Sequence, residues 1–282
     1  MKTEITNVSD TALWVATYRA HESKREDALF RDPLAESLAG EKGERIARSM
    51  KGSAYVSWSV IIRTYIIDAY ILHLVSQGID TVINLGAGLD TRPYRMNLPH
   101  SLHWIEVDFP HLIQMKEDHL REQKPHCHLE RIPLDLSDRK ARTQLFSRIQ
   151  LQSKKILVLT EGVIPYLTEE QVAQLAEDIR LQDHFQFWIV DYYSPRMMQY
   201  MTNRRMKQLR NAPLQFRPSD WFSFFKDHGW QPKEIQYLGE VGDQIGRSMP
   251  TPWFFKIILF CIPAKRRSEH KQYLAYALLQ PY

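Results

Sequence analysis

A mostly apolar segment leads directly into two glycines in Ile83-Asn84-Leu85-Gly86-Ala87-Gly88-Leu89-Asp90-Thr91-Arg92. Residues 80–85 have the short, apolar pattern of a strand that is covered on both faces. Glycines at the carboxyl end of such a strand let the backbone approach a ligand closely, at the edge where open α/β sheets bind nucleotides. The segment therefore predicts an α/β fold with a nucleotide-type ligand on the turn at Gly86.

The chain after this turn alternates between two kinds of pattern. Four apolar segments of strand length follow, at residues 102–107, 128–132, 155–160 and 185–190. Helical segments lie between them, and one begins with a capping box formed by Thr168 and Gln171. Strands that alternate with helices predict βαβ units and a parallel sheet.

The segments on either side of this alternation differ from it. Residues 1–77 are expected to form a helical cap at the N-terminus, whose last helix stops at Gly78. Residues 196–219 carry six cationic side chains and no acidic one, and we interpret them as a lid insertion in which one or two arginines contact the substrate. The sheet domain then comprises residues 78–195 and 220–282. Its last part is expected to hold a helix at 220–228, a strand at 233–238, a helix at 253–261 and a final strand at 273–279.

The composition is that of a globular protein. The chain has 282 residues, of which 44% are hydrophobic and 25% charged, and its net charge is +4.

The cationic stretch at residues 196–219 has few of the interleaved aromatic residues that favour nucleic-acid binding, so we expect no nucleic-acid partner. The two cysteines have no metal-ligand spacing, so no metal is expected. The N-terminus lacks a signal-peptide pattern and residues 253–262 are too short to span a bilayer, which predicts a cytoplasmic location and no membrane partner.

The residues around the glycine turn indicate the type of ligand. A dinucleotide-binding site has a third glycine at the position of Thr91, which allows a helix N-terminus to contact the pyrophosphate. The neighbouring Asp90 would repel a pyrophosphate but would tolerate a cationic sulfonium and an ammonium group. Acidic residues also follow the next three strands, where they could bind ribose, adenine and an amino group: they are Glu106 or Asp108, Asp135 ahead of Leu136, and Glu161. The set favours S-adenosylmethionine over a dinucleotide.

Ordered motifs along nearly the whole chain resemble the leucine carboxyl methyltransferase family, most closely its bacterial members that are similar to tetracenomycin-type polyketide carboxyl O-methyltransferases. The motifs lie at residues 11–16, 19–23, 30–35, 63–64, 84–92, 106–110, 161–163, 246–250, 252–253 and 276–279. The resemblance implies a class I methyltransferase that uses S-adenosyl-L-methionine. It implies a Rossmann-like fold with a seven-stranded mixed sheet, a helical cap and a lid insertion.

The resemblance also implies a set of cofactor-binding residues at matching positions. These are Lys24, Arg63, Gly86, Gly88, Asp90, Asp108, Asp135, Leu136 and Glu161. Lys24 and Arg63 would pair with the carboxylate of the cofactor, and Glu161 with its amino-acid moiety. Asp108 would bind the ribose. The residues alone leave another possibility open for Arg63, which is an ion pair with Asp68 or another acid.

The chemistry of methyl transfer sets few demands on the protein. A methyl sulfonium is already an activated electrophile, so the protein has mainly to align the acceptor and exclude water. An ionised carboxylate needs no general base, whereas a phenol would need one, and His21 or Glu22 would then be the first candidates. Tyr166 is the candidate for orienting the acceptor, with simple packing beside the capping box as its alternative. We expect O-methylation of a small carboxylic acid or polyketide-like compound, at a carboxylate or a hydroxyl group.

Three other functions are compatible with these patterns. The first is methylation of a protein C-terminal carboxylate, as in the eukaryotic branch of the family. The second is an NAD-binding oxidoreductase, because a glycine turn by itself is shared by several nucleotide folds. The third is a protein that binds the cofactor without turnover.

Overall fold

The computed structural model describes residues 9–50, 53–204, 213–251 and 269–282. At its centre is one sheet of seven strands in the order β3-β2-β1-β4-β5-β7-β6. The strands are β1 (Thr81–Leu85), β2 (His103–Asp108), β3 (His128–Pro133), β4 (Ile156–Thr160), β5 (Phe185–Tyr193), β6 (Trp230–Tyr237) and β7 (Leu274–Pro281). The first five are parallel, and β7 is antiparallel to both β5 and β6. This mixed seven-stranded sheet confirms the fold class that the sequence predicted.

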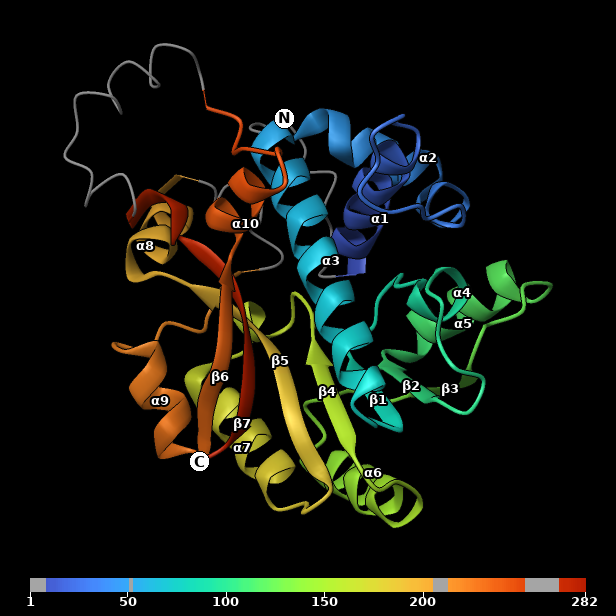
Figure 1. The fold of residues 1–282 in the computed structure, drawn as a ribbon, viewed down its shortest axis with the longest axis vertical. Coiled ribbons are helices and arrows are strands. Elements are labelled where there is room, and N and C mark those ends of the chain that lie inside the picture. Colours follow the sequence, from blue (N-terminus) through green and yellow to red (C-terminus); the bar gives the residue numbers. More distant parts are fainter. Residues whose placement is uncertain (1–8, 51–52, 205–212, 252–268) are drawn as a thin grey trace.

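Helices pack on both faces of this sheet (Figure 1). They are α1 (Ser9–Ser23), α2 (Ala35–Ser49), α3 (Ser53–Ser76), α4 (Arg92–Arg95), α5 (Pro110–Leu120), α6 (Arg139–Gln152), the 3-10 helix η1 (Ile164–Tyr166), α7 (Glu169–Arg180), α8 (Pro195–Arg204), α9 (Trp221–Asp227) and α10 (Leu238–Gln244). The predicted capping box is present, since Thr168 and Gln171 each bind the other's backbone N–H at the start of α7. The predicted helix at 253–261 lies outside the described residues.

The two faces of the sheet are buried against different helices because successive residues of a strand point to opposite sides. In β4, Leu157 and Leu159 pack with α3 and α10, whereas Ile156 and Val158 pack with α6, α7 and α9. Every residue of β1 and β4 is buried, which explains why these segments are largely apolar in the sequence. The strand ends are therefore held rigidly and can position side chains at the sheet edge.

Helix α3 is, within the described ranges, the one helix that is long and apolar enough to cross a membrane by length and composition alone. Its residues Ile62, Ile66, Tyr70 and Leu74, which recur at four-residue steps, are at most 2% exposed. They pack into the cluster that covers one face of the sheet. This packing accounts for the apolar composition of the helix.

The segment interpreted as a lid insertion begins with α8 and continues, after the part that is not described, at residue 213. The backbone N–H of Gln215 donates to the carbonyl oxygen of Pro165 over 2.7 Å, so this segment lies beside η1. The division of the chain into a cap at 1–77, a sheet domain and a lid insertion at 196–219 stays a prediction.

Candidate functional site

A cavity of about 510 Å³ opens at the carboxyl ends of the parallel strands, within the range of roughly 300–1,000 Å³ that small-molecule sites occupy. Three parts of the chain line it: the turns after β1 to β4, the helices α1 and α3, and a third wall formed by η1, the end of β5, α8 and residues 214–215. The lining contains the predicted residues Arg63, Gly86, Gly88, Asp90, Asp108, Asp135, Leu136, Glu161 and Tyr166. The structure thus brings together every predicted site residue except Lys24.

Lys24 is not among the lining residues. It follows the end of α1, and its Nζ lies 2.6 Å from Oε1 of Glu36 on α2, with both side chains largely exposed. Sequence spacing could not reveal that Lys24 would pair with Glu36 on the next helix. This ion pair holds the ammonium group of Lys24 away from the cavity. The role predicted for Lys24 at the cofactor carboxylate has no support in this arrangement.

The glycine turn has the backbone conformation that its sequence predicts. Gly86 and Gly88 have φ angles of +68° and +49°, which side chains rarely allow. The N–H of Gly86 donates to the carbonyl oxygen of Val107 over 2.8 Å, which ties the turn to the end of β2. A Cβ atom on Gly86 would overlap the side chain of Val163 in the turn after β4. Gly86 is therefore required both by its φ angle and by the close approach of two strand ends.

Asp108, and not Glu106, is the acid that reaches the cavity from β2. The two oxygens of Asp108 accept the N–H groups of Gly88 and Phe109 over 2.6 and 2.7 Å, and burial raises the pKa of Asp108. Each oxygen keeps a second lone pair for a ligand hydroxyl. Glu106 lies two residues earlier, fully buried, where it binds Lys116 of α5 over 2.7 Å. Covering by α5 thus removes Glu106 from the ligand side.

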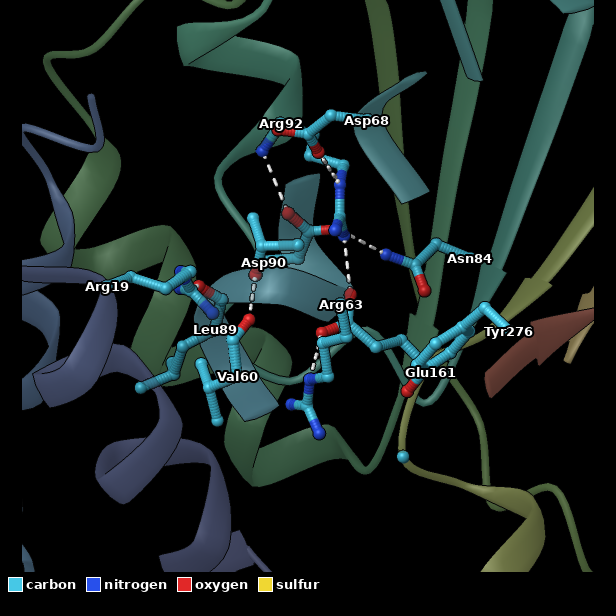
Figure 2. A network of polar contacts seen from close by, with 12 residues as sticks. Arg19, Val60, Arg63, Asp68, Asn84, Leu89, Asp90, Arg92, Glu161 and Tyr276 are labelled. Carbon is cyan, nitrogen blue, oxygen red and sulfur yellow. Dashed lines mark hydrogen bonds and ion pairs between the residues drawn. The ribbon is translucent and has the colours of Figure 1, made fainter. Parts of the chain in front are cut away.

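Arg92 is at the centre of a buried ion network beneath the cavity (Figure 2). Its Nε donates to Asp68 over 2.7 Å, and its Nη1 donates to Asp90 over 2.8 Å and to Glu161 over 2.7 Å. Asp90 also accepts the side-chain N–H of Asn84 over 2.8 Å. Arg92 belongs to the predicted glycine motif, but its place in this network was not predicted. The sequence did contain a signal for this role: Arg92 is a cation that lies two residues after the acid Asp90, next to the glycine turn.

The charge of Asp90 is directed into this network. Burial disfavours the carboxylate, but Arg92, Lys116 and Arg19 outweigh burial and hold the pKa of Asp90 well below its usual value. Asp90 is therefore ionised at neutral pH, and Arg92 offsets its charge. Its main contribution is to fix the turn, which differs from the repulsion of a pyrophosphate that the sequence suggested.

Arg19 connects the cap helices to the same turn. Its Nη2 donates to the carbonyl oxygen of Leu89 over 2.5 Å, and its Nε donates to Asp32 over 2.8 Å. Figure 2 shows its guanidinium beside Leu89 at the turn. Arg19 is only 6% exposed and lines the cavity, so it holds the glycine turn from the side of α1.

Arg63 presents a buried cation to the cavity from α3. Its Nε lies 2.9 Å from Oε1 of Glu161, but the geometry gives that buried N–H no hydrogen-bond partner among the described residues. Asp68 binds Arg92 and Arg95 instead, so the ion pair that the sequence left open for Arg63 is made with another acid, Glu161. The guanidinium has further N–H groups that can donate to a ligand. It can bind a ligand carboxylate through two parallel hydrogen bonds.

Glu161 stands between two arginines, and Figure 2 shows Arg92 and Arg63 on opposite sides of its carboxylate. Burial opposes its charge, but Arg92 and Arg63 hold the pKa of Glu161 below its usual value. An ionised carboxylate at this position suits a ligand ammonium group.

The candidate general bases for a phenol acceptor do not lie at the cavity. His21 is exposed, with its Nε2 2.6 Å from Glu44, and Glu22 is buried, where it accepts the N–H of Leu29 over 2.8 Å. No histidine is present in the lining formed by the described residues. The expectation that His21 or Glu22 could serve as the base is therefore wrong in this arrangement, because the connection from α1 to α2 holds both away from the cavity.

Tyr166 does lie at the cavity, on η1. Its hydroxyl is hydrogen-bonded to Thr11 of α1, and burial raises the pKa of Tyr166, so the phenol stays protonated at neutral pH. The carbonyl oxygen of Tyr166 accepts the side-chain N–H of Gln215 over 2.8 Å. Tyr166 can orient an acceptor as a hydrogen-bonding hydroxyl and cannot act as a phenolate.

The cations of the predicted lid insertion are only partly described. Arg196 pairs with Glu269 over 2.9 Å, and Arg217 donates to the carbonyl oxygen of Leu214 over 2.8 Å. Neither lines the cavity, whereas Leu214 does. The side chain of Arg204 and all of Arg205, Lys207 and Arg210 lie outside the described residues.

Replacing Arg63 by methionine is expected to weaken cofactor binding by about tenfold to a hundredfold, since a charge-assisted hydrogen bond contributes about 1.5–3 kcal/mol. The affinity is measured by titration calorimetry with S-adenosylhomocysteine. Lys24→Met is the matched comparison, and its pairing with Glu36 predicts a change of less than about twofold. A larger loss with Lys24→Met than with Arg63→Met would contradict the placement of the two side chains.

Comparison with known proteins adds to this geometry. The model of the leucine carboxyl methyltransferase family matches residues 12–180. Proteins of Streptomyces coelicolor and Streptomyces avermitilis, both provisionally named S-adenosyl-L-methionine-dependent methyltransferases, are 34% and 31% identical to this chain. The first alignment covers 58% of this chain and 62% of the relative, and the second covers 86% and 89%. A crystal structure of a DUF574 family protein from Streptomyces avermitilis is similar in fold, with a TM-score of 0.59, 12% identity, and coverage of 95% of this chain and 97% of that one.

Proposed function

The chain belongs to the leucine carboxyl methyltransferase family, and from this premise we propose that it methylates the carboxylate of a small molecule. It is an S-adenosylmethionine-dependent methyltransferase. The cofactor supplies the activated methyl group, and the protein has to hold the acceptor in line with it and exclude water.

The residues at the cavity fit this cofactor. The guanidinium of Arg63 would meet its carboxylate and Glu161 its ammonium group, while the free lone pairs of Asp108 would accept the ribose hydroxyls. Asp135 and Leu136, in the turn after β3, line the same cavity and would contact the adenine. The glycine at position 86 lets the turn take its left-handed backbone conformation at the cavity.

A carboxylate acceptor is favoured by one observation, which is that the described lining offers no group suited to take up a proton. It contains no histidine, and its acids Asp90 and Glu161 are held ionised by arginines that lower their pKa values. Its other acids, Asp108 and Asp135, would be engaged by the ribose and the adenine of the cofactor. Tyr166 stays protonated. A hydroxyl acceptor needs a base, whereas a carboxylate is already ionised at neutral pH. The site is therefore better matched to esterification of an acid than to methylation of a phenol.

The lining on the acceptor side of the cavity favours a small, largely apolar acid as the substrate. Apolar and aromatic side chains form the part of the lining that lies away from the turns after β1 to β4; they include Trp14, Tyr55, Val56, Tyr193, Met197 and Leu214. Concave sites of this kind bind apolar ligands and use a few polar groups for orientation.

The proposed reaction is tested with methyl-labelled S-adenosylmethionine and a panel of acceptors. The panel pairs aromatic carboxylic acids with phenols of the same ring system and adds a peptide with a free C-terminal carboxylate. We expect label in a methyl ester that mild alkali hydrolyses, from the acids alone. An alkali-stable ether formed from the phenols, with the acids unlabelled, would contradict the proposal, and labelling of the peptide alone would redirect it to a protein acceptor.

Tyr166→Phe is expected to lower kcat by about tenfold, the effect of losing one orienting hydrogen bond of up to about 1.5 kcal/mol. Its affinity for the cofactor should stay within about twofold of the wild-type value, because the backbone of η1 is unchanged. Tyr192→Phe is the matched control, since Tyr192 packs against Trp221 and does not line the cavity. Steady-state kinetics with the acid acceptor gives both constants, and an unchanged kcat would assign Tyr166 to packing alone.

A further inference from the structure

Asp191 is a buried carboxyl group at the end of β5 that the proposed reaction does not use. It is only 2% exposed. One of its oxygens accepts the hydroxyl of Tyr276 over 2.6 Å, and the backbone N–H of Gly162 lies 3.2 and 3.1 Å from the two oxygens. Tyr276 is the direct neighbour of Asp191 in the pairing of β5 with β7.

These contacts place Asp191 directly behind a residue of the cofactor site. Thr160 pairs with Val190, so the turn that follows β4 lies beside Asp191. That turn consists of Glu161 and Gly162, both of which line the cavity, and Gly162 has a φ angle of +69°. By binding the N–H of Gly162, Asp191 holds the turn that carries Glu161.

Among the described residues, Asp191 forms no direct ion pair with a cationic side chain. The ion pairs beneath the cavity join three arginines to three carboxylates: Arg63, Arg92 and Arg95 with Asp68, Asp90 and Glu161. Equal numbers of the two charges cancel within this network. Asp191 takes part in none of these ion pairs, so when it is ionised this end of the cavity is net negative.

We propose that Asp191 is a positioning residue which also supplies the net negative charge by which the site favours the cationic methyl donor over its neutral product. The proposal rests on the cofactor assigned above. S-adenosylmethionine carries a sulfonium, an ammonium and a carboxylate group, and loss of the methyl group removes the sulfonium charge. A buried negative charge therefore binds the donor more tightly than the product, by about tenfold for charges roughly 12 Å apart at an effective dielectric of about 20. Ionised Asp191 would therefore favour exchange of the product for a fresh donor after each transfer.

Titration of Asp191 near neutral pH makes the proposal testable. Burial raises the pKa of Asp191 to about 6, while the hydrogen bond from Tyr276 and the charge of Arg63 act in the opposite direction. The titratable and charged groups that face it come from every neighbouring element: Arg63 on α3, Glu161 after β4, Tyr166 on η1, Tyr193 on β5, Tyr276 on β7 and Arg217, which shares a smaller cavity with it. Glu161 has a lowered pKa and the tyrosines raised ones, so these groups keep their charge state around pH 6.

The experiment measures the affinities of S-adenosylmethionine and S-adenosylhomocysteine by titration calorimetry at about pH 5 and about pH 8. In the wild-type protein, the preference for the donor is expected to rise by about tenfold between these values. Asp191→Asn should abolish this rise and keep the preference seen at acid pH. His111→Gln is the control, because His111 contacts Ser9 at the cavity over 2.8 Å but should not affect the rise.

Tyr276→Phe provides a second variant, which keeps Asp191 and removes only the hydroxyl that stabilises its charged form. Its pKa should rise further, so the increase in preference should move to higher pH. An unchanged pH dependence in Asp191→Asn, or an equal loss of affinity for both ligands, would overturn the proposal and leave the methyltransferase assignment intact. Failure of the wild-type protein to bind either ligand would contradict the assignment itself, and the proposal with it.

Discussion

Replacing Arg92 by methionine is expected to lower the free energy of unfolding by about 3–5 kcal/mol, the usual cost of removing one partner from a buried ion pair. Arg92 is 2% exposed, and its guanidinium touches Asp68, Asp90 and Glu161. Methionine fills similar space but leaves these carboxylates with too few partners. Asp90 loses its nearest cation, and Glu161 keeps only Arg63. We expect the glycine turn to lose its rigidity together with the stability of the fold.

The loss is measured by denaturant unfolding of Arg92→Met beside Arg121→Met. The side chain of Arg121 is 78% exposed and pairs with Asp118 over 3.1 Å, so its replacement should cost less than about 1 kcal/mol. Equal effects of the two substitutions would show that the network around Arg92 contributes nothing specific.

The effect of Arg92→Met also depends on pH in a defined direction. The pKa values of Asp90 and Glu161 lie below their usual values in the folded protein. The stabilisation linked to these carboxylates is therefore present at neutral pH and is lost as the pH falls through the lowered values, below about pH 4. The difference in stability between the wild-type protein and Arg92→Met should shrink in that range.

Replacing Gly86 by alanine is expected to weaken cofactor binding by about a hundredfold or more, the effect of shifting binding groups by about 1 Å. The added Cβ would overlap Val163, and the φ angle of +68° costs alanine about 1 kcal/mol in addition. The turns after β1 and β4 would have to separate, and the turn after β4 carries Glu161, which is expected to hold the amino-acid end of the cofactor.

Two further variants separate the overlap from the backbone effect. Gly78→Ala places a methyl group at a φ angle of +94° with no atom within 4 Å, so it should lower stability without affecting cofactor affinity. Val163→Ala removes the overlapping methyl group and should restore part of the affinity when combined with Gly86→Ala. Calorimetric titration of the four variants with S-adenosylhomocysteine gives the coupling, and strict additivity would exclude the overlap as the cause.

The sheet could be predicted from the sequence because its signal is local. The strands β1 and β4 are buried on both faces, so each is a short apolar run followed by the glycine or acid that the ligand needs. The last strands were also found, but the antiparallel direction of β7 depends on its pairing with β5 and followed only from the family resemblance. Local patterns thus located the strands, while their direction required more than the residues themselves.

The site was predicted less completely, since its side chains depend on partners that are distant in the sequence. Lys24 forms an ion pair with Glu36, and Glu106 forms one with Lys116. Neither partner can be predicted from sequence spacing alone. Asp191 was missed for another reason. The prediction covers the acids that follow the first four strands and ends the fifth strand at residue 190, whereas β5 continues to Tyr193 and places Asp191 at the same edge.

Binding of S-adenosylmethionine at the Gly86 turn is tested most directly by equilibrium dialysis of the labelled cofactor against the wild-type protein and Gly86→Ala, with competition by S-adenosylhomocysteine or NAD. We expect one saturable site in the wild-type protein, displacement by S-adenosylhomocysteine but not by NAD, and loss of binding in Gly86→Ala. Displacement by NAD, or binding to Gly86→Ala with wild-type affinity, would contradict the assignment of this cavity to the methyl donor.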